Sequence, residues 1–233
     1  MKTIYNAVHA AHRAEYEFFR GEKVPAFEKP ERADWVHAAV QRAGLGEVLS
    51  PQAHDDAAIL KVHAEPYVRF LRGAHDEFLA LGGQGSAFPA VWAIRGMRSD
   101  IEPKNFAARM GLYSFDAGSP LTAGTWQATR TGADCALTAV DLLNTGERSV
   151  FVLTRPPGHH AGRDFFGGYC FLNHAAIAAH HATARVVPLP SAVPHSAALH
   201  CPTLHGATAP HGAALHGAAL HGAALHGATA PHG

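Results

Sequence analysis

The sequence has 233 residues and a mass of 24.6 kDa, which allows one domain of ordinary size and argues against two full domains. Its 19 Lys and Arg balance 19 Asp and Glu, so charge gives no reason to expect nucleic acid or an anionic membrane as a partner. No uncharged apolar run reaches the roughly 18 residues of a membrane span, and the charged N-terminus lacks the apolar core of a signal peptide. We therefore expect a cytoplasmic protein.

The cysteines and histidines differ in what they indicate. Cys135, Cys170 and Cys201 are an odd number without CxxC spacing, which predicts neither a disulfide framework nor a thiolate zinc site. We expect the first two to be small buried residues. The 19 histidines exceed ordinary usage, so their positions decide what they mean.

The composition changes abruptly towards the C-terminus. All Asp and Glu lie at or before Asp164, and eight of the 19 histidines follow Ala182. The segment after Ala182 consists mainly of Ala, His, Gly, Leu and Pro, and it repeats in five-residue units from Leu204. Such small residues bury too little apolar area to offset the entropy of ordering, which predicts a disordered, low-complexity tail over 182–233. A frameshift, a degenerate gene and an artificial sequence all fit this change, and the sequence leaves the three open.

Residues 1–181 have the pattern of an α/β domain. Lys2–Tyr5 is expected to form a short strand, either the first strand or an edge strand. Pro30 starts a predicted helix that Gly44 ends, and its apolar residues fall on one stripe: Trp35, Val36, Ala39, Val40 and Ala43. Pro66 opens a second helix, which closes at Gly82-Gly83, with apolar residues at three- and four-residue steps: Tyr67, Phe70, Leu71, Ala74, Phe78 and Leu81.

The second half of this domain predicts a parallel sheet. Residues 82–122 form a connection longer than a compact fold needs, which indicates a binding or oligomer-forming loop. A long helix is expected over 124–143, with Trp126, Ala133, Leu137 and Val140 on one face, followed by a buried strand over 149–153. Because ligands of parallel sheets bind beyond the carboxyl ends of the strands, the residues after Leu153 are the first candidates for chemistry.

Two adjacent imidazoles stand in that place. Arg155-Pro156-Pro157-Gly158 leads into His159 and His160 on a turn that proline stiffens and glycine tightens. One imidazole suits general acid and base catalysis and the other suits holding a developing charge, whereas two surface or capped histidines are the alternative. Aromatic residues around Gly167-Gly168 suggest a narrow channel: Phe165, Phe166, Tyr169 and Phe171. Phe165 or Phe166 could instead be plain core. Asn173 is expected to cap a helix over 174–184.

These residues carry a family resemblance. RPPGHHAGRDFFGGYCFLN (155–173) is similar to the signature of the zinc-dependent histone deacetylase superfamily, in particular its bacterial acetylpolyamine amidohydrolase branch. The likeness covers about residues 1–181 and includes further matching segments at 21–36, 62–71, 99–103 and 122–126. It implies an arginase-like α/β fold with a parallel sheet, and removal of acetyl groups from a small acetylated polyamine or from acetyllysine.

The resemblance also implies roles for single residues. His160 corresponds to the general base and acid, and His159 to the partner imidazole that polarises the same water. Tyr169 corresponds to the wall of the substrate tunnel, with Gly168 beside it. Glu102 corresponds to the acidic residue that attracts the cationic polyamine; without the resemblance it is a solvated loop residue. The 82–122 loop corresponds to the insertion used for homodimer formation, and His174 departs from the Asn or Asp usual in the family.

The expected zinc cofactor lacks its ligands in this sequence. The family holds zinc with two aspartates and one histidine from later strands, the first two in an Asp-x-His run. The segment that resembles the first of those strands, 184–195, has Pro188 and Pro190 in place of acidic residues, and no carboxylate follows Asp164. Tyr169 is the last tyrosine, so the family's transition-state tyrosine is also missing. We expect no zinc site from this chain, and therefore no catalysis.

Two other functions stay open. The histidines of 182–233 could bind divalent metal loosely, as His-rich tracts do, although incidental imidazoles in a disordered tail are the simpler reading. The folded part could also act as a non-catalytic dimer or polyamine-binding remnant through the 82–122 loop.

Overall fold

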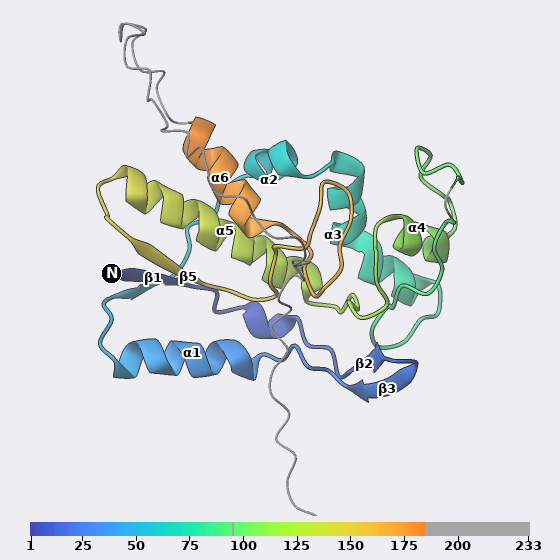
Figure 1. Cartoon of the computed structure of the whole chain (residues 1–233), viewed down its shortest axis with the longest axis horizontal. Helices are drawn as coiled ribbons and strands as arrows, with labels where there is room; N and C mark the ends of the chain where they lie inside the picture. The colour runs from blue at the N-terminus through green and yellow to red at the C-terminus, as the bar shows by residue number, and fades with distance from the viewer. Residues whose placement is uncertain (95, 185–233) are drawn as a thin grey trace, which may run out of the picture. The chain divides into compact units, whose positions relative to one another are not determined.

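The computed structural model, which describes residues 1–94 and 96–184, contains a parallel sheet. Strand β1 (Lys2–Tyr5) is its middle strand, between β4 (Val48–Leu49) and β5 (Val150–Leu153) (Figure 1). Both pairings are parallel, with Ile4 in register with Leu49 on one side and Val152 on the other. The predicted α/β class with a parallel sheet is therefore confirmed, and Lys2–Tyr5 is a central strand rather than an edge strand.

Helices cover both faces of this sheet. Helix α1 (Glu31–Arg42) lies on one face and α5 (Thr125–Asn144) on the other (Figure 1). Helices α3 (Glu65–Ala80) and α6 (His174–Ala184) complete the set that the sequence predicted, each within two residues of the expected bounds. The Asn173 cap is confirmed as well, because its Oδ1 accepts the Ala176 N–H at 3.0 Å.

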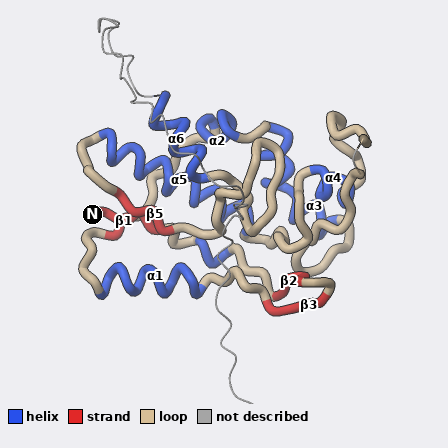
Figure 2. Tube along the Cα trace, in the orientation of Figure 1, coloured by secondary structure: helices blue, strands red, loops and turns tan. Residues whose placement is uncertain are grey.

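Several elements had not been predicted. Strands β2 (Tyr16–Phe19) and β3 (Glu22–Pro25) form an antiparallel hairpin (Figure 2). The short helices η1 (His9–Ala11) and α2 (Ala57–Val62) lie in segments without a clear period. Helix α4 (Phe106–Leu112) lies inside the 82–122 connection, where Asn105 caps it by accepting the Ala108 N–H at 3.1 Å. That connection is therefore partly helical.

The main core joins α3, α5 and α6 to the segment that follows β5. Its buried residues come from these elements: Tyr67, Phe70, Leu71, Ala133, Leu137, Phe166, Phe171, Leu172 and Ile177. Ile4, Cys135 and Ala139 form a smaller cluster between β1 and α5. Cys135 and Cys170 are buried free thiols, as predicted, whereas Cys201 lies outside the described residues.

The apolar stripe of α1 is less buried than its pattern suggests. Val40 is buried, but Trp35 is 70 % exposed and lines an open apolar groove of about 520 Å³ with Met1, Leu45 and Phe151. Within 1–94 and 96–184, β5 pairs on one edge only, with β1. A three-stranded sheet is too narrow to cover the whole stripe, which explains the exposure.

Two other expectations concern membranes and the tail. Over the described residues, every helix is too short or too polar to cross a bilayer. Of the predicted tail at 182–233, residues 185–233 lie outside what the structure describes.

Buried neutral histidines make the stability of this fold sensitive to acid. Burial lowers the pKa of His12 to about 3 and that of His174 to about 4, from an ordinary value of 6.5. Below pH 6.5 these two histidines are protonated in the unfolded chain but stay neutral in the folded chain. The free energy of unfolding therefore falls as the pH drops, by about 1.4 kcal/mol per pH unit for each histidine.

We expect His174→Asn to remove one of these contributions. The free energy of unfolding, measured by urea titration at several pH values from about 6 to about 4.5, should then fall less steeply, by about 1.4 kcal/mol per pH unit. His180→Asn, at an exposed position of the same helix, is the control and should keep the wild-type slope. Equal slopes in all three proteins would contradict the assignment.

Candidate active site

The segment beyond β5 starts from a buried anchor, Arg155. Its guanidinium donates to Glu28 Oε1 at 2.9 Å from Nε, and to the carbonyls of His9 and His12 at 2.6 and 2.8 Å from Nη1. Arg155 is 3 % exposed and Glu28 is 5 % exposed, so each charge is compensated where water cannot reach it. The Arg155–Pro156 peptide is cis. This anchor sets the position from which the next residues leave the sheet.

The two predicted imidazoles lie side by side after this anchor. The ring centroids of His159 and His160 are 4.2 Å apart, and the ring planes are tilted by 48°. Both residues are exposed, so solvent and a ligand can reach them. Exposure alone fits either a catalytic pair or two surface histidines, and the distinction depends on what holds the rings.

Gly168 packs directly against one of these rings. A Cβ atom at this position would lie 2.6 Å from Cδ2 of His160, closer than real contacts allow. Gly168 also has a φ of 56°, in the left-handed region that favours glycine. The absence of a side chain therefore lets the backbone touch the His160 ring.

Tyr169 has the same left-handed conformation without being glycine. Its φ of 65° is uncommon for a residue with a bulky side chain and has an energetic cost. Hydrogen bonds from the 113–122 segment hold it: the Ser119 hydroxyl accepts the Tyr169 N–H at 2.8 Å, and the Asp116 carboxylate accepts the Gly168 N–H. Asp116 also accepts the Gly118 N–H at 3.1 Å, which fixes the carboxylate itself.

The ring of Tyr169 is held from a different part of the chain. Its hydroxyl donates to Oε1 of Glu17 at 2.8 Å, and the Phe27 N–H donates to the other carboxylate oxygen at 3.1 Å. Glu17 belongs to β2 and is only 3 % exposed. Burial, and then the hydrogen bond to Glu17, raise the pKa of Tyr169 well above 10.0, so the phenol stays a neutral donor.

The aromatic residues of this segment divide into core and surface. Phe166 and Phe171 are fully buried and belong to the main core. Phe165 is 40 % exposed and meets the ring of Phe115 edge to face, with centroids 5.8 Å apart. Of the two residues that the sequence left open, Phe166 is core and Phe165 is surface.

The structure places Glu102 in an ion pair with Arg69. Its carboxylate lies 3.2 Å from Nη2 of Arg69, and burial together with this carboxylate raises the pKa of Tyr113 to about 12. Within the described residues, Glu102 contacts Arg69 of α3 and Tyr113. The structure thus brings His159, His160 and Gly168 together, with Tyr169 next to Gly168 in the chain, and shows Glu102 in contact with α3.

The described residues do not fit a zinc ion. Over 1–94 and 96–184, no three His, Cys, Asp or Glu side chains gather closely enough to hold a metal. The His pair supplies two nitrogen donors, and no third side chain of these types joins them closely enough within the described residues. We therefore derive no chemical step through zinc.

Sequence reasoning missed the residues that support Gly168 and Tyr169. Asp116, with Gly118 and Ser119 close behind it, has the composition of an Asx turn, so a signal was present. Glu17 had no such signal, because its burial follows from an unpredicted hairpin.

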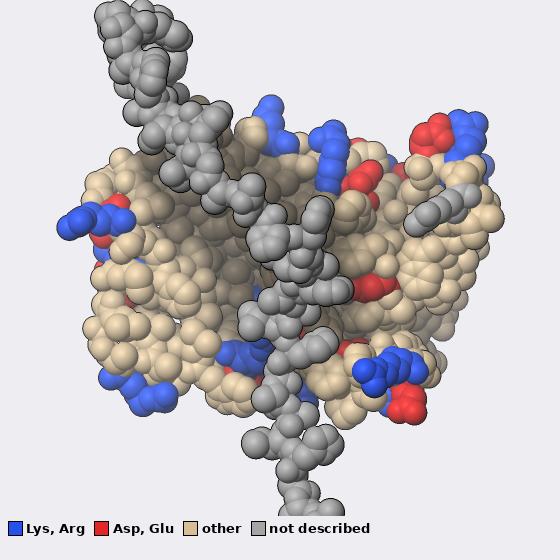
Figure 3. Space-filling view, viewed as in Figure 1, with Lys and Arg blue, Asp and Glu red and all other residues tan. Residues whose placement is uncertain are grey.

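Charge on the molecular surface is mixed in sign. On the face seen in Figure 3, Lys and Arg lie next to Asp and Glu in small groups near the margins, and most of the described surface between them is uncharged. Where the described residues are visible in this view, they form no broad basic patch of the kind that binds nucleic acid.

Known proteins resemble this chain over most of its length. Residues 26–188 match the family described as histone deacetylase domain. The chain is 49 % identical over 179 residues to acetylpolyamine amidohydrolase 2 of Pseudomonas aeruginosa, and 40 % identical over 179 residues to acetylpolyamine amidohydrolase of Mycoplana ramosa. Each alignment covers 77 % of this chain and 52 % of the relative.

A solved structure shares the fold. The crystal structure of an acetylpolyamine aminohydrolase from Burkholderia pseudomallei superposes with a TM-score of 0.73 and 32 % sequence identity, over 79 % of this chain and 53 % of that chain. The chain therefore spans about half the length of the relatives that it matches.

Substitution of Gly168 tests the packing of the His pair. We expect Gly168→Ala to lower the free energy of unfolding by more than Gly21→Ala, because both glycines have positive φ but only Gly168 has a ring in the way. The NMR signals of His160 should shift in Gly168→Ala and stay in place in Gly21→Ala. Equal destabilisation with unmoved His160 signals would show that the ring is not held by this contact.

Proposed function

The chain belongs to the histone deacetylase family, and we propose that it provides the imidazole half of a deacetylase site for acetylated polyamines or acetyllysine. One observation carries this proposal: the His159–His160 pair lies against the backbone of Gly168, in the residues that match the family. Two incidental surface histidines would need no glycine in the left-handed region packed onto one ring. The names of the relatives support acetylated polyamines as the substrate class.

Each residue has a physical task in this proposal. In a complete site, His160 would accept a proton from water and return it to the leaving amine, and His159 would donate a hydrogen bond to the same water. Tyr169 lines the path of the substrate, with the Gly168 backbone beside the acyl amide. Glu102 attracts the cationic end of the polyamine, which has to compete with the Arg69 guanidinium.

We further propose that this chain does not hydrolyse the amide by itself. In this family, bound zinc supplies the activated water. The described residues do not fit that ion, and residues 165–233 contain no carboxylate. The proposed organisation is accordingly an incomplete deacetylase-like domain over 1–181, joined to a low-complexity tail over 182–233.

Assembly and location are part of the same proposal. The 82–122 loop exposes apolar side chains that suit a homodimer contact: Val91, Trp92, Ile94, Met97 and Ile101. A cytoplasmic location belongs to the same proposal.

A second candidate function rests on the tail. Eight histidines spaced five or six residues apart favour loose binding of divalent metal, without fixed geometry. Such binding would survive His160→Ala and disappear on truncation at residue 182, whereas a deacetylase site would behave in the opposite way.

Calorimetry with N-acetylputrescine tests the main proposal. We expect the full chain to bind this ligand, His160→Ala to weaken the binding about tenfold, and His180→Ala to change it less than about twofold, because one hydrogen bond is worth about 1.4 kcal/mol. Acetate release should not exceed the rate in buffer. Release that His160→Ala abolishes would overturn the claim of inactivity, and absence of binding would overturn the claim of a substrate site.

A further inference from the structure

The loop that carries the two imidazoles is closed at its base by the start of α3. We call residues 158–173 the His-pair loop. The Ala64 N–H donates to the carbonyl of Arg163 at 2.8 Å, and the Tyr67 hydroxyl donates to the carbonyl of Phe171 at 2.5 Å. The first turn of α3 thus contacts both arms of the loop.

His63 makes a further contact at the same place. It precedes α3, is completely buried, and its Nε2 accepts the Asn173 N–H at 2.9 Å. An amide N–H can only donate, so Nε2 carries no proton and the neutral ring has its proton on Nδ1. The ring also lies near the backbone of Gly162 and Arg163, and its Nδ1 has no hydrogen-bond partner among the described residues. His63 therefore lies between the two arms of the His-pair loop.

The side chain of Asn173 makes two further hydrogen bonds. Its Nδ2 donates to the carbonyl of Ala161 at 3.1 Å, directly after the imidazole pair. Its Oδ1 caps α6 through the Ala176 N–H. A shift of the Asn173 backbone would therefore move the residue next to His160 as well as the start of α6.

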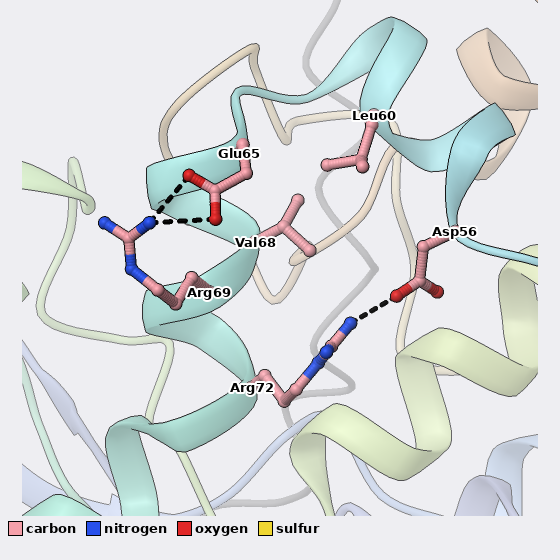
Figure 4. Close-up of a pocket in the computed structure, with 6 residues that line it drawn as sticks. All are labelled: Asp56, Leu60, Glu65, Val68, Arg69 and Arg72. Carbon is pink, nitrogen blue, oxygen red and sulfur yellow. Dashed lines mark hydrogen bonds and ion pairs between the residues drawn. The ribbon is translucent and has the colours of Figure 1, made fainter.

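Ion pairs also hold the first turns of α3. Figure 4 shows Arg72 of α3 directed towards Asp56 and Arg69 paired with Glu65 in the same helix. These charges line a groove of about 330 Å³, and Asp56 is also bound by Arg130 of α5 at 2.8 Å. Helix α3, which follows His63, is thus linked to α5 through Asp56.

We propose that His63 is the positioning residue of the imidazole pair: by accepting the Asn173 N–H between the two arms of the His-pair loop, it fixes where His159 and His160 stand. This inference rests on the proposed function. His63 touches no substrate and acts through Asn173 and Ala161. Its ring also packs near Tyr67, with centroids 5.6 Å apart, which restricts its rotation.

NMR of the full chain labelled with ¹⁵N-histidine tests this role without substrate. In the wild type we expect His63 to carry its proton on Nδ1. His63→Leu should shift and broaden the His159 and His160 signals, because the Asn173 N–H loses its acceptor. His63→Gln offers a carbonyl in the same region and should restore most of the wild-type signal positions. His75→Leu is the matched control, because His75 bonds the carbonyl of Gly85 at the other end of α3.

Binding of N-acetylputrescine gives a second readout. We expect affinity to fall about tenfold in His63→Leu, to recover to within about twofold of wild type in His63→Gln, and to stay unchanged in His75→Leu. If the wild type binds no ligand but His63→Leu still shifts the His159 and His160 signals, the proposed function is overturned and the role of His63 stays supported.

Three results would overturn the role of His63. The first is a folded His63→Leu protein with unmoved His159 and His160 signals. The second is a His63 ring protonated on Nε2 in the wild type, which stays measurable if His63→Leu fails to fold. The third is a folded His63→Gln protein whose imidazole signals and affinity do not recover.

Discussion

The buried ion pair between Arg155 and Glu28 is the interaction on which the candidate site depends. It joins the residue that follows β5 to the segment before α1, and through the carbonyls of His9 and His12 to the N-terminal residues. Removing one partner would leave the other charge buried and uncompensated, at a cost of about 3–5 kcal/mol. Because Arg155 stands four residues before His159, this pair fixes the direction in which the His-pair loop leaves the sheet.

Hydrogen bonds from three separate segments hold the rest of the site. Glu17 holds the phenol of Tyr169, Asp116 and Ser119 hold the backbone beside it, and His63 closes the base of the loop. These groups come from a hairpin, from the 113–122 segment and from the start of α3. The imidazole half of the site therefore has its own support, which explains how it can be ordered where the described residues do not fit zinc.

Periodicity in the sequence was sufficient for the elements that bury one face. It predicted α3 and α5 from apolar spacing and β5 from an apolar run, and the segment after β5 was correctly placed beyond a parallel strand. The hairpin was missed because Arg20-Gly21, with φ of 52° and 84°, is a weaker turn signal than Asn-Gly. His63 could not be assigned, since its contact with Asn173 joins residues 110 positions apart. Trp35 shows the converse: its helical stripe was recognised, but its exposure depends on how many strands lie beneath it.

The central claim is that this chain orders the imidazole pair without completing a zinc site. Elemental analysis of the purified full chain after dialysis against zinc-free buffer tests it most directly. We expect less than one tightly held zinc per chain, and any loosely held metal should be lost on truncation at residue 182. One zinc per chain that survives dialysis and is lost in His160→Ala would contradict the account, because it would mean that ligands outside the described residues complete the site.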